Sequence, residues 1–271
     1  MTALVIDQPG LYDVPEADYH ADRVLAPTLG RSLSSSGAKA ILDSPARFAW
    51  ERDHPVVKDA YDFGQVAHTL LLGSGPEIHV VDADSWRTKA AQEEREAARL
   101  AGAVPLLKAD AERAQVLVQA VMAHPVARAI FSVDGKAEQS LYWIDDETGV
   151  TCRGRIDWLH PRAIVDLKTS VNASPAKFSR ALVDYGYALQ AEWYSQGYEA
   201  VTGERLPFVH VVVEKEPPHL VAVYQVDAEA LAFGADLASQ ARRLYAECES
   251  NDDWPGYSPE IELVSLPAWA R

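Results

Sequence analysis

The sequence predicts an α/β fold, in which a central mixed sheet containing a three-strand antiparallel meander carries helices on both faces. Two observations support this prediction. Apolar residues recur at helical spacing in the first half of the chain, whereas residues 140–169 are rich in β-branched and aromatic residues between turn signals. A helix, two strands and a long helix are predicted to follow, and this order is typical of a sheet covered on both sides.

The first half is predicted to be mainly helical. Its serines at positions 34–36 are good N-caps for a short helix that ends near Asp43, and Pro45 opens a further helical turn. Residues 63–72 form a predicted helix that Gly73 ends. The side chains expected to face the core from that helix are Phe63, Val66, Leu70 and Leu71. Residues 86–100 and 109–122 are predicted to be solvated surface helices.

The middle of the chain changes to strand periodicity. Turn signals at residues 147–149 and 160–162 separate three predicted antiparallel strands. These strands are Ser140–Asp145, Val150–His160 and Ala163–Thr169. A helix starts at Ser174-Pro175, with a break expected at residues 185–187, and runs to Gly203. The rest is predicted to be a hairpin, Phe208–Glu214 with Leu220–Val226, and a final helix, Asp227–Glu249.

Composition sets limits on the class of protein. The chain has 271 residues with 48% hydrophobic and 24% charged residues, which excludes disordered and fibrous classes. We expect one domain built of an N-terminal helical elaboration (1–135), a catalytic meander and helix (136–203), and a C-terminal hairpin and helix (204–271). Two cysteines cannot form a disulfide framework, a four-thiolate zinc site or a cysteine-ligated iron–sulfur site.

Membrane and secretion signals are not expected. The apolar runs are short, as in Val209–Val213, which His210 interrupts, and they fall far below the ~20 residues that span a bilayer. The first ten residues carry no basic side chain, unlike a signal peptide. A soluble cytoplasmic protein without a membrane partner is the simplest expectation.

The charge is uneven along the chain. The net charge of −15, from 25 basic and 40 acidic residues, argues against indiscriminate phosphate binding. However, residues 151–180 carry six basic side chains against two acidic ones. The sign of a local surface matters more than the total for a ligand that meets one face, so an anionic partner near the middle of the chain stays open.

The sharpest local pattern lies in the predicted meander. Gly154-Arg155-Ile156-Asp157 is followed by Ile164-Val165-Asp166-Leu167-Lys168. Alternate residues of a strand share a face, so Asp166 and Lys168 project together, and the turn at 160–162 brings Asp157 beside them. Such carboxylates suit Mg²⁺. Solvated side chains on an exposed strand pair are an equally good interpretation of this spacing alone.

Other polar residues are ambiguous when taken singly. His68 lies in a predicted helix beside leucines and fits a core histidine as well as a ligand. Glu138 precedes the first meander strand and fits a solvent-facing residue. Gln190 and Tyr194 are four residues apart and therefore share a helix face, which any amphipathic helix would also show.

In this order, these residues resemble the RecB-like branch of the PD-(D/E)xK nucleases, and most closely the RecE-type exonucleases of phages and prophages. The resemblance runs from about residue 19 to about residue 200. The matching stretches are Tyr19-His20-Ala21, Leu33–Pro45, Phe63-Gly64 with His68, Arg153–Asp157, Val165–Thr169, and Tyr187, Gln190 and Tyr194. Each motif is weak alone. Five motifs in the order Gly-x-x-x-His, Glu, Gly-x-x-Asp, Asp-Leu-Lys and Gln-x-x-x-Tyr are specific. Asp166 stands where many PD-(D/E)xK enzymes carry Glu, and RecE-like members commonly carry Asp there.

The resemblance implies a role for each matching residue, on a restriction-endonuclease-like core. Asp157, Asp166, His68 and the Leu167 carbonyl would ligate Mg²⁺, for which Mn²⁺ would substitute. Lys168 would position and help deprotonate the attacking water, and Glu138 would support the metal or the water. Gln190 and Tyr194 would contact substrate or hold the catalytic strands. The residues implied in DNA binding are Ser34, Ser36, Arg47, Arg153 and Arg155, although helix capping explains the two serines equally well.

The resemblance also implies an activity and partners. The expected enzyme is a Mg²⁺-dependent exodeoxyribonuclease that digests one strand of double-stranded DNA from a 5′ end and leaves 3′ single-stranded tails for recombination. Its expected partners are DNA ends, a single-strand annealing protein of the RecT type and further copies of the chain, in a homo-oligomer that could be a ring. Three alternatives stay open: a structure-specific or nicking endonuclease on the same fold, an inactive DNA-end-binding module, and a Mg²⁺-dependent nucleotide phosphatase, which the lack of a Gly-rich phosphate loop disfavours.

Overall fold

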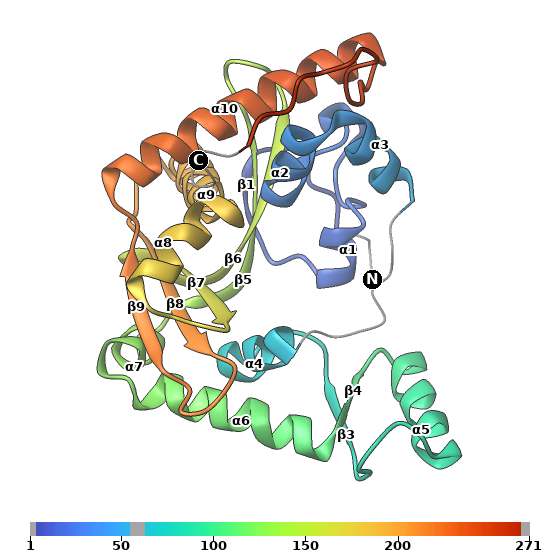
Figure 1. Cartoon of the computed structure of the whole chain (residues 1–271), viewed down its shortest axis with the longest axis vertical. Helices are drawn as coiled ribbons and strands as arrows, with labels where there is room; N and C mark the ends of the chain where they lie inside the picture. The colour runs from blue at the N-terminus through green and yellow to red at the C-terminus, as the bar shows by residue number, and fades with distance from the viewer. Residues whose placement is uncertain (1–3, 55–62, 267–271) are drawn as a thin grey trace.

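A mixed sheet forms the centre of the structure (Figure 1). The computed structural model describes residues 4–54 and 63–266. Within these residues, the strand order of the sheet is β1-β5-β6-β7-β8-β9, and β2 pairs with β6 beside this path. The strands are β1 (Gly10–Tyr12), β2 (Leu33–Ser34), β5 (Lys136–Ile144), β6 (Thr151–His160), β7 (Ala163–Ser170), β8 (Phe208–Glu214) and β9 (Val221–Gln225).

The predicted meander and hairpin are confirmed. Strands β5, β6 and β7 pair antiparallel in sequence order, and β8 and β9 pair antiparallel. Strand β8 lies parallel to β7, with a helical connection between them, so the sheet is mixed. That connection breaks as predicted, into α8 (Pro175–Asp184) and α9 (Tyr187–Thr202), because Gly186 takes a left-handed conformation with φ of 63°.

Helices cover both faces of the sheet, as the sequence predicts (Figure 1). On one face, α2 (Ser35–Asp43), α9 and α10 (Ala228–Asn251) pack over a core that includes Ile156 and Trp193. On the other face, α4 (Phe63–Leu72), α6 (Lys108–Ala123) and α7 (Pro125–Phe131) pack on Val165, Leu167 and Val211. The remaining elements are α1 (Glu16–His20), η1 (Pro27–Leu29), α3 (Pro45–Asp53), β3 (Ile78–Val81), α5 (Lys89–Leu100) and β4 (Val104–Leu107).

Local sequence explains where the N-terminal helices begin. The Ser34 hydroxyl accepts a hydrogen bond from the Gly37 amide at 3.1 Å and caps α2, while the Ser44 hydroxyl accepts from the Arg47 amide at 3.3 Å and caps α3. Pro45 occupies the first turn of α3, where its missing N–H costs nothing. These caps fix α2 against α9 and α10, which places its N-terminus at the sheet.

Two expectations in the first half of the chain were wrong, and one pair of strands was not predicted. Helix α6 is not a solvated surface helix, since its Ala114, Leu117 and Val121 are buried against the sheet and α4; small alanines among polar residues hid this face. Leu70 does not face the core but is 37% exposed, although Val66 is buried. The side chain of Phe63 lies outside the described residues. The parallel pair β3–β4 was not predicted, because four-residue strands carry little periodicity.

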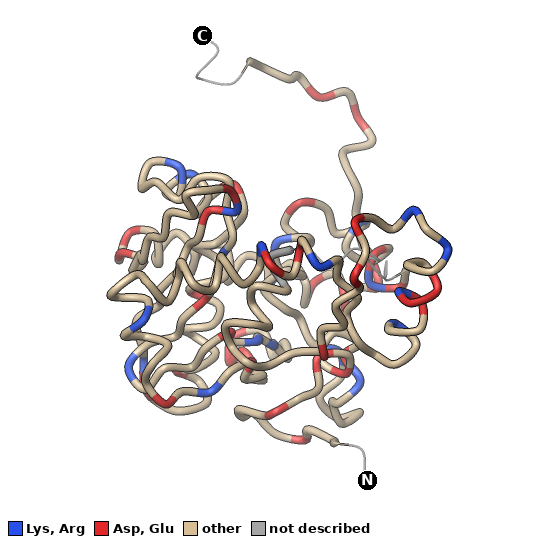
Figure 2. Tube along the Cα trace, turned by 90° about the horizontal axis from the view of Figure 1, so that it is seen from below, with Lys and Arg blue, Asp and Glu red and all other residues tan. Residues whose placement is uncertain are grey.

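Among the described helices, none is by itself long and apolar enough to cross a membrane. Helices α6 and α7 reach the length and composition of a span only when joined, and they are bent by 98° relative to each other. Basic and acidic residues are interspersed over the trace, and the C-terminal segment extends away from the body (Figure 2).

Candidate active site

The site opens where strands β6 and β7 separate. Their pairing covers three residue pairs, from His160 with Ala163 to Trp158 with Val165. Asp157 and Asp166 would be the next pair in this register. Instead, Asp157 Oδ2 accepts a hydrogen bond from the Leu167 amide at 2.8 Å, so a side chain replaces the missing ladder bond. The separated strands leave both carboxylates beside one cavity.

Four polar residues follow one another across the sheet. Asp166 lies directly opposite His210 of β8. In the register of β5 with β6, Glu138 stands opposite Asp157, but its φ of 52° turns the backbone into the left-handed region and interrupts the ladder there. Such a conformation costs an ordinary residue roughly 1–3 kcal/mol and clusters at functional sites. The row Glu138–Asp157–Asp166–His210 therefore spans four strands.

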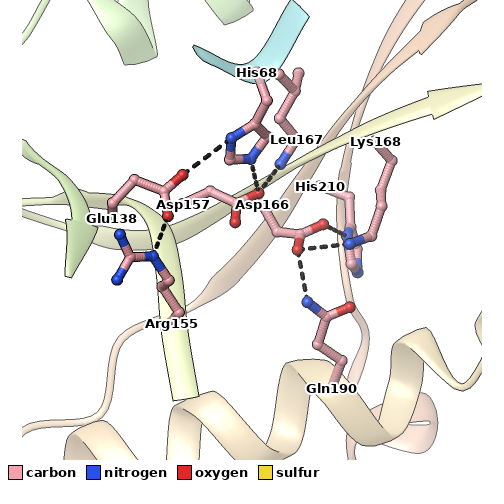
Figure 3. Close-up of polar contacts among 9 residues, drawn as sticks. All are labelled: His68, Glu138, Arg155, Asp157, Asp166, Leu167, Lys168, Gln190 and His210. Carbon is pink, nitrogen blue, oxygen red and sulfur yellow. Dashed lines mark hydrogen bonds and ion pairs between the residues drawn. The ribbon is translucent and has the colours of Figure 1, made fainter. Parts of the chain in front are cut away.

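One half of the site centres on His68, which α4 brings over the strands (Figure 3). Its Nδ1 lies 3.0 Å from Glu138 Oε1 and its Nε2 lies 2.8 Å from Asp157 Oδ2. Burial alone would lower the pKa of His68, but the two carboxylates outweigh it and raise this pKa to about 10. Glu138 also accepts from Arg155 Nε, and despite burial the pKa of Glu138 is lowered by His68 and Arg155. The imidazole here holds a proton between two anions.

The other half centres on Asp166, which is almost completely buried (Figure 3). Its Oδ1 accepts from Lys168 Nζ and from Gln190 Nε2, both at 2.8 Å, and its Oδ2 lies 3.0 Å from His210 Nδ1. Burial would raise the pKa of Asp166, but Lys168 and His210 hold it far below its usual range. The same ion pair raises the pKa of Lys168 against the effect of burial. This carboxylate is thus fixed in one orientation.

Both halves line one cavity of about 570 Å³. Its walls include most of the residues that the sequence singled out. The predicted site residues that line it are Ser34, Ser36, His68, Glu138, Arg153, Arg155, Asp157, Asp166, Leu167, Lys168, Gln190 and Tyr194. The His68 ring therefore reaches a cavity that Asp157, Asp166 and Lys168 also line.

Several of these residues are already engaged in other contacts. Arg153 forms an ion pair with Asp22 and donates to Ser32, while Arg155 pairs with Glu138. The Tyr194 ring packs so closely on β6 that a Cβ at Gly154 would lie 2.8 Å from it. Ser34 caps α2 and also contacts the Ser36 hydroxyl at 3.0 Å. These contacts explain how the walls hold their shape.

Arg47 is not brought to the cavity. It lies on α3, where its guanidinium pairs with Asp43 and donates to the Tyr257 hydroxyl. The capped turn at Ser44 starts α3, and the Ala46 amide donates to the Pro255 carbonyl, which holds this helix against the segment after α10. The implied role of Arg47 beside Ser34 and Ser36 finds no support in this position.

Sequence reasoning missed three residues at the site. His210 is fully buried and contacts Asp166, and its signal was a polar residue interrupting an apolar strand. Lys39 lines the cavity from α2, and burial together with the nearby Lys168 lowers the pKa of Lys39. The Tyr187 ring lies 4.9 Å from Lys168 Nζ. Lys39 and Tyr187 fall within the matching stretches but gave no separate signal.

A candidate cation site lies in the half of the site that centres on His68. One nitrogen of His68 and one oxygen each of Glu138 and Asp157 lie within 4.8 Å of one another, the only such group found among the described residues. Asp166 and Leu167 stand beside this group rather than in it, whereas Glu138 belongs to it. Two carboxylate oxygens and one imidazole nitrogen suit a divalent cation that keeps open positions for water and phosphate oxygens.

The sheet, its flanking helices and the carboxylates with Lys168 are features of the PD-(D/E)xK class of folds. Within that class, the chain belongs to the family described as "PDDEXK-like domain of unknown function (DUF3799)", whose profile matches residues 34–267. None of the curated proteins compared with the chain matches it.

The chain is also similar to solved structures. A candidate exonuclease from Eubacterium rectale superposes with a TM-score of 0.61 at 13% identity, over 94% of this chain and 96% of that chain. A phage-related exonuclease from Haemophilus somnus matches with a TM-score of 0.36 at 13% identity, over 82% and 96%. An alkaline exonuclease from Laribacter hongkongensis matches with a TM-score of 0.28 at 16% identity, over 69% and 96%. At these identities, the first match shows the fold.

Proposed function

We propose that the protein is a Mg²⁺-dependent deoxyribonuclease that digests one strand of duplex DNA from a 5′ end and leaves 3′ single-stranded tails. The observation that carries the nuclease proposal is the convergence of Asp157, Asp166, Lys168 and His68 on one cavity of a PD-(D/E)xK fold. The 5′ polarity rests on the resemblance to RecE-type enzymes alone. The exonuclease mode rests on the same resemblance, and the fold shared with a candidate exonuclease supports it.

His68, Glu138 and Asp157 would hold the cation, with Asp166 beside them. When bound, the cation supplies Lewis-acid polarisation of the phosphate and a lower pKa for its water. Mn²⁺ should substitute for Mg²⁺, since both accept carboxylate oxygens. His68 must give up its proton to act as a ligand, because an imidazolium has no free lone pair. A cation of charge +2 would then replace one proton between the carboxylates.

Lys168 supplies the charge that faces the reacting phosphate. As an ammonium it donates hydrogen bonds and cannot accept a proton, so it orients the attacking water or neutralises a phosphoryl oxygen. Asp166 anchors it at 2.8 Å, and Gln190 holds the same carboxylate oxygen from the opposite side.

Partners are a further part of the proposal. A nuclease that leaves single-stranded tails would hand them to an annealing protein of the RecT type, and a homo-oligomer, in the form of a ring, would keep the enzyme on its DNA. These two partners rest on the resemblance alone. Size-exclusion chromatography with light scattering, with and without DNA, tests the oligomer directly.

The activity is tested by incubating the purified chain with linear and with covalently closed circular duplex DNA, with Mg²⁺ or with EDTA. We expect degradation of the linear duplex only, only with Mg²⁺, and loss of a 5′ label before a 3′ label. Cleavage of the closed circle would indicate an endonuclease instead. A chain that cleaves neither substrate with Mg²⁺ or Mn²⁺ would contradict the nuclease proposal.

A further inference from the structure

We propose that Tyr185 is a stacking platform for an unpaired base, next to the cavity wall that Lys39 and Tyr187 form, so that the substrate enters as a frayed DNA end. This inference rests on the proposed function and adds a binding site and a substrate form to it. It starts from an exposed aromatic ring beside the reactive centre: Tyr185 is 65% exposed and lies in the break between α8 and α9.

The ring is connected to the reactive centre by a short series of contacts. Tyr185 and Tyr187 have ring centroids 5.7 Å apart, with an interplanar angle of 42°. Tyr187 lines the cavity, and its ring lies 4.9 Å from Lys168 Nζ. Behind it, Phe178 stacks on Tyr187 with centroids 6.0 Å apart. A base on Tyr185 would therefore lie one ring away from the residue that contacts the scissile phosphate.

The platform is held rigidly, which distinguishes it from an ordinary exposed tyrosine. The Tyr185 amide donates to the Ala181 carbonyl at 3.1 Å, and its carbonyl accepts from Lys39 Nζ at 3.2 Å. The next residue, Gly186, adopts a left-handed conformation, and a Cβ there would lie 2.5 Å from Lys39 Cδ. Glycine at this position thus lets the Lys39 stem pack against the backbone that carries Tyr185.

Charge and shape together define the ligand. Lys39 brings a cation to the same rim, at the cavity wall that also holds Lys168. An aromatic face beside a cation fits a nucleotide, since the base stacks and the phosphate pairs with the ammonium. A base inside a duplex has both faces covered by its neighbours, whereas an unpaired or terminal base offers a free face. The pair Tyr185 and Lys39 therefore fits a single nucleotide that has left the duplex.

The test measures binding of end-labelled duplexes to the full-length chain with Ca²⁺ in place of Mg²⁺. One duplex is blunt and fully paired, and the other carries two mismatched pairs and a 2-aminopurine at the 5′ end. We expect tighter binding of the frayed end by the parent chain, with quenching of the 2-aminopurine fluorescence. Tyr185→Ala should bind the frayed end about 5- to 150-fold more weakly and lose the quenching, in line with the loss of one base–aromatic stack.

Three variants separate the ring from other effects. Tyr185→Phe keeps the ring and should bind within about twofold of the parent. Tyr257→Ala removes a tyrosine of similar exposure, 73%, that does not line the cavity, and should leave binding and quenching unchanged. Lys39→Met keeps the stem on Gly186 but removes the charge, and should reduce the slope of log affinity against log salt by about one.

The outcomes are distinct. Equal affinity and quenching in Tyr185→Ala and the parent would overturn the platform while leaving the nuclease proposal standing. A Tyr185→Phe variant as weak as Tyr185→Ala would overturn stacking, because the hydroxyl and not the ring would then carry the effect. A parent chain that binds neither duplex would overturn both proposals.

Discussion

The two halves of the site, one centred on His68 and the other on Asp166, differ in burial and in hydrogen bonding. His68, Glu138 and Asp157 keep 14–20% of their side-chain surface exposed and share one proton among a histidine and two carboxylates. Asp166 and His210 are at most 2% exposed, and both oxygens of Asp166 are engaged by protein donors. The first half can exchange its proton for a cation at little structural cost, whereas the second cannot change without breaking several buried hydrogen bonds.

This difference suits the two halves to two tasks. The more exposed half exchanges a proton for a metal ion, and the buried half orients a carboxylate and an ammonium. A metal-binding half must release a proton and admit an ion, so some access to solvent is necessary. An orienting half must hold a carboxylate and an ammonium within tenths of an ångström, and burial with complete hydrogen bonding does this best. Substitutions in the two halves should therefore have different effects on metal binding, turnover and folding.

The largest effect is expected for Asp166→Asn. It removes the charge that holds Lys168 and replaces a carboxylate beside the cation site, so cleavage of linear duplex should fall at least about 1,000-fold. It also leaves Lys168 partly buried without its ion pair, which should lower the free energy of unfolding by roughly 1–3 kcal/mol. Single-turnover assays and urea unfolding measure both. Mg²⁺-dependent cleavage near the parent rate would contradict the assignment.

Lys168→Ala should affect turnover alone. The ammonium orients the water or the phosphate and does not bind the cation, so we expect cleavage to slow by about 100-fold or more while DNA ends still bind. Asp166 would keep its contacts with Gln190 and His210, so the fold should persist. End-labelled DNA is used for binding in Ca²⁺ and for cleavage in Mg²⁺. An unchanged rate would reduce Lys168 to a structural residue.

The sequence predicted Asp157, Asp166 and Lys168 better than the residues that surround them. Asp166 and Lys168 alternate within one strand, and a tight turn brings Asp157 beside them, so local spacing was sufficient. His210 reaches Asp166 only because β8 pairs parallel to β7 in one register, after a connection of more than thirty residues. No local pattern contains that register, although a histidine among valines marked the position.

Arg47, which the resemblance implied at the DNA-binding site, shows the same limit of local sequence patterns. Arg47 lies eleven residues after Ser36, two residues beyond the matching stretch Leu33–Pro45, and the resemblance implied DNA binding for both. The capped turn at Ser44 starts a second helix, and that helix carries Arg47 to the segment after α10. The direction of a chain after a cap depends on what the next helix packs against. Here, the stacking of Phe48 and Arg52 near Trp254 decides it.

His210 offers an intermediate test of the orienting half. Its Nδ1 holds Asp166 Oδ2, and its Nε2 has no hydrogen-bond partner among the residues that the structure describes, so only one hydrogen bond has to be replaced. His210→Phe should reduce kcat about 10- to 100-fold by releasing that oxygen, and His210→Asn should recover part of it, since its amide can donate to the same oxygen. A structural role alone would lower stability in both variants without such a recovery of kcat.

A smaller effect is expected on the pH dependence of stability, and it concerns the half of the site that contains His68. The pKa of His68 is raised in the folded protein, from 6.5 to about 10, so its contribution to stability is complete below about pH 6.5 and is lost as the pH rises toward 10. In EDTA, the parent should lose stability over this range relative to His68→Gln, by an amount of the order of 2 kcal/mol. Thermal unfolding at pH 6 and pH 10 measures the difference. Parallel curves for the two proteins would show that His68 carries no raised pKa.

The smallest effect is expected for Arg47→Ala, and it tests whether the resemblance or the structure places this residue correctly. Arg47 is exposed on α3, pairs with Asp43 and Tyr257, and does not line the cavity. Exposed ion pairs contribute little, and no contact from Arg47 reaches the site. Cleavage and DNA-end binding should therefore stay within about twofold of the parent. Ser36→Ala is the matched comparison, because Ser36 lies in the same stretch of sequence and does line the cavity. A strong loss of end binding in Arg47→Ala, with Ser36→Ala unaffected, would show that the DNA crosses α3 and not the cavity wall formed by α2.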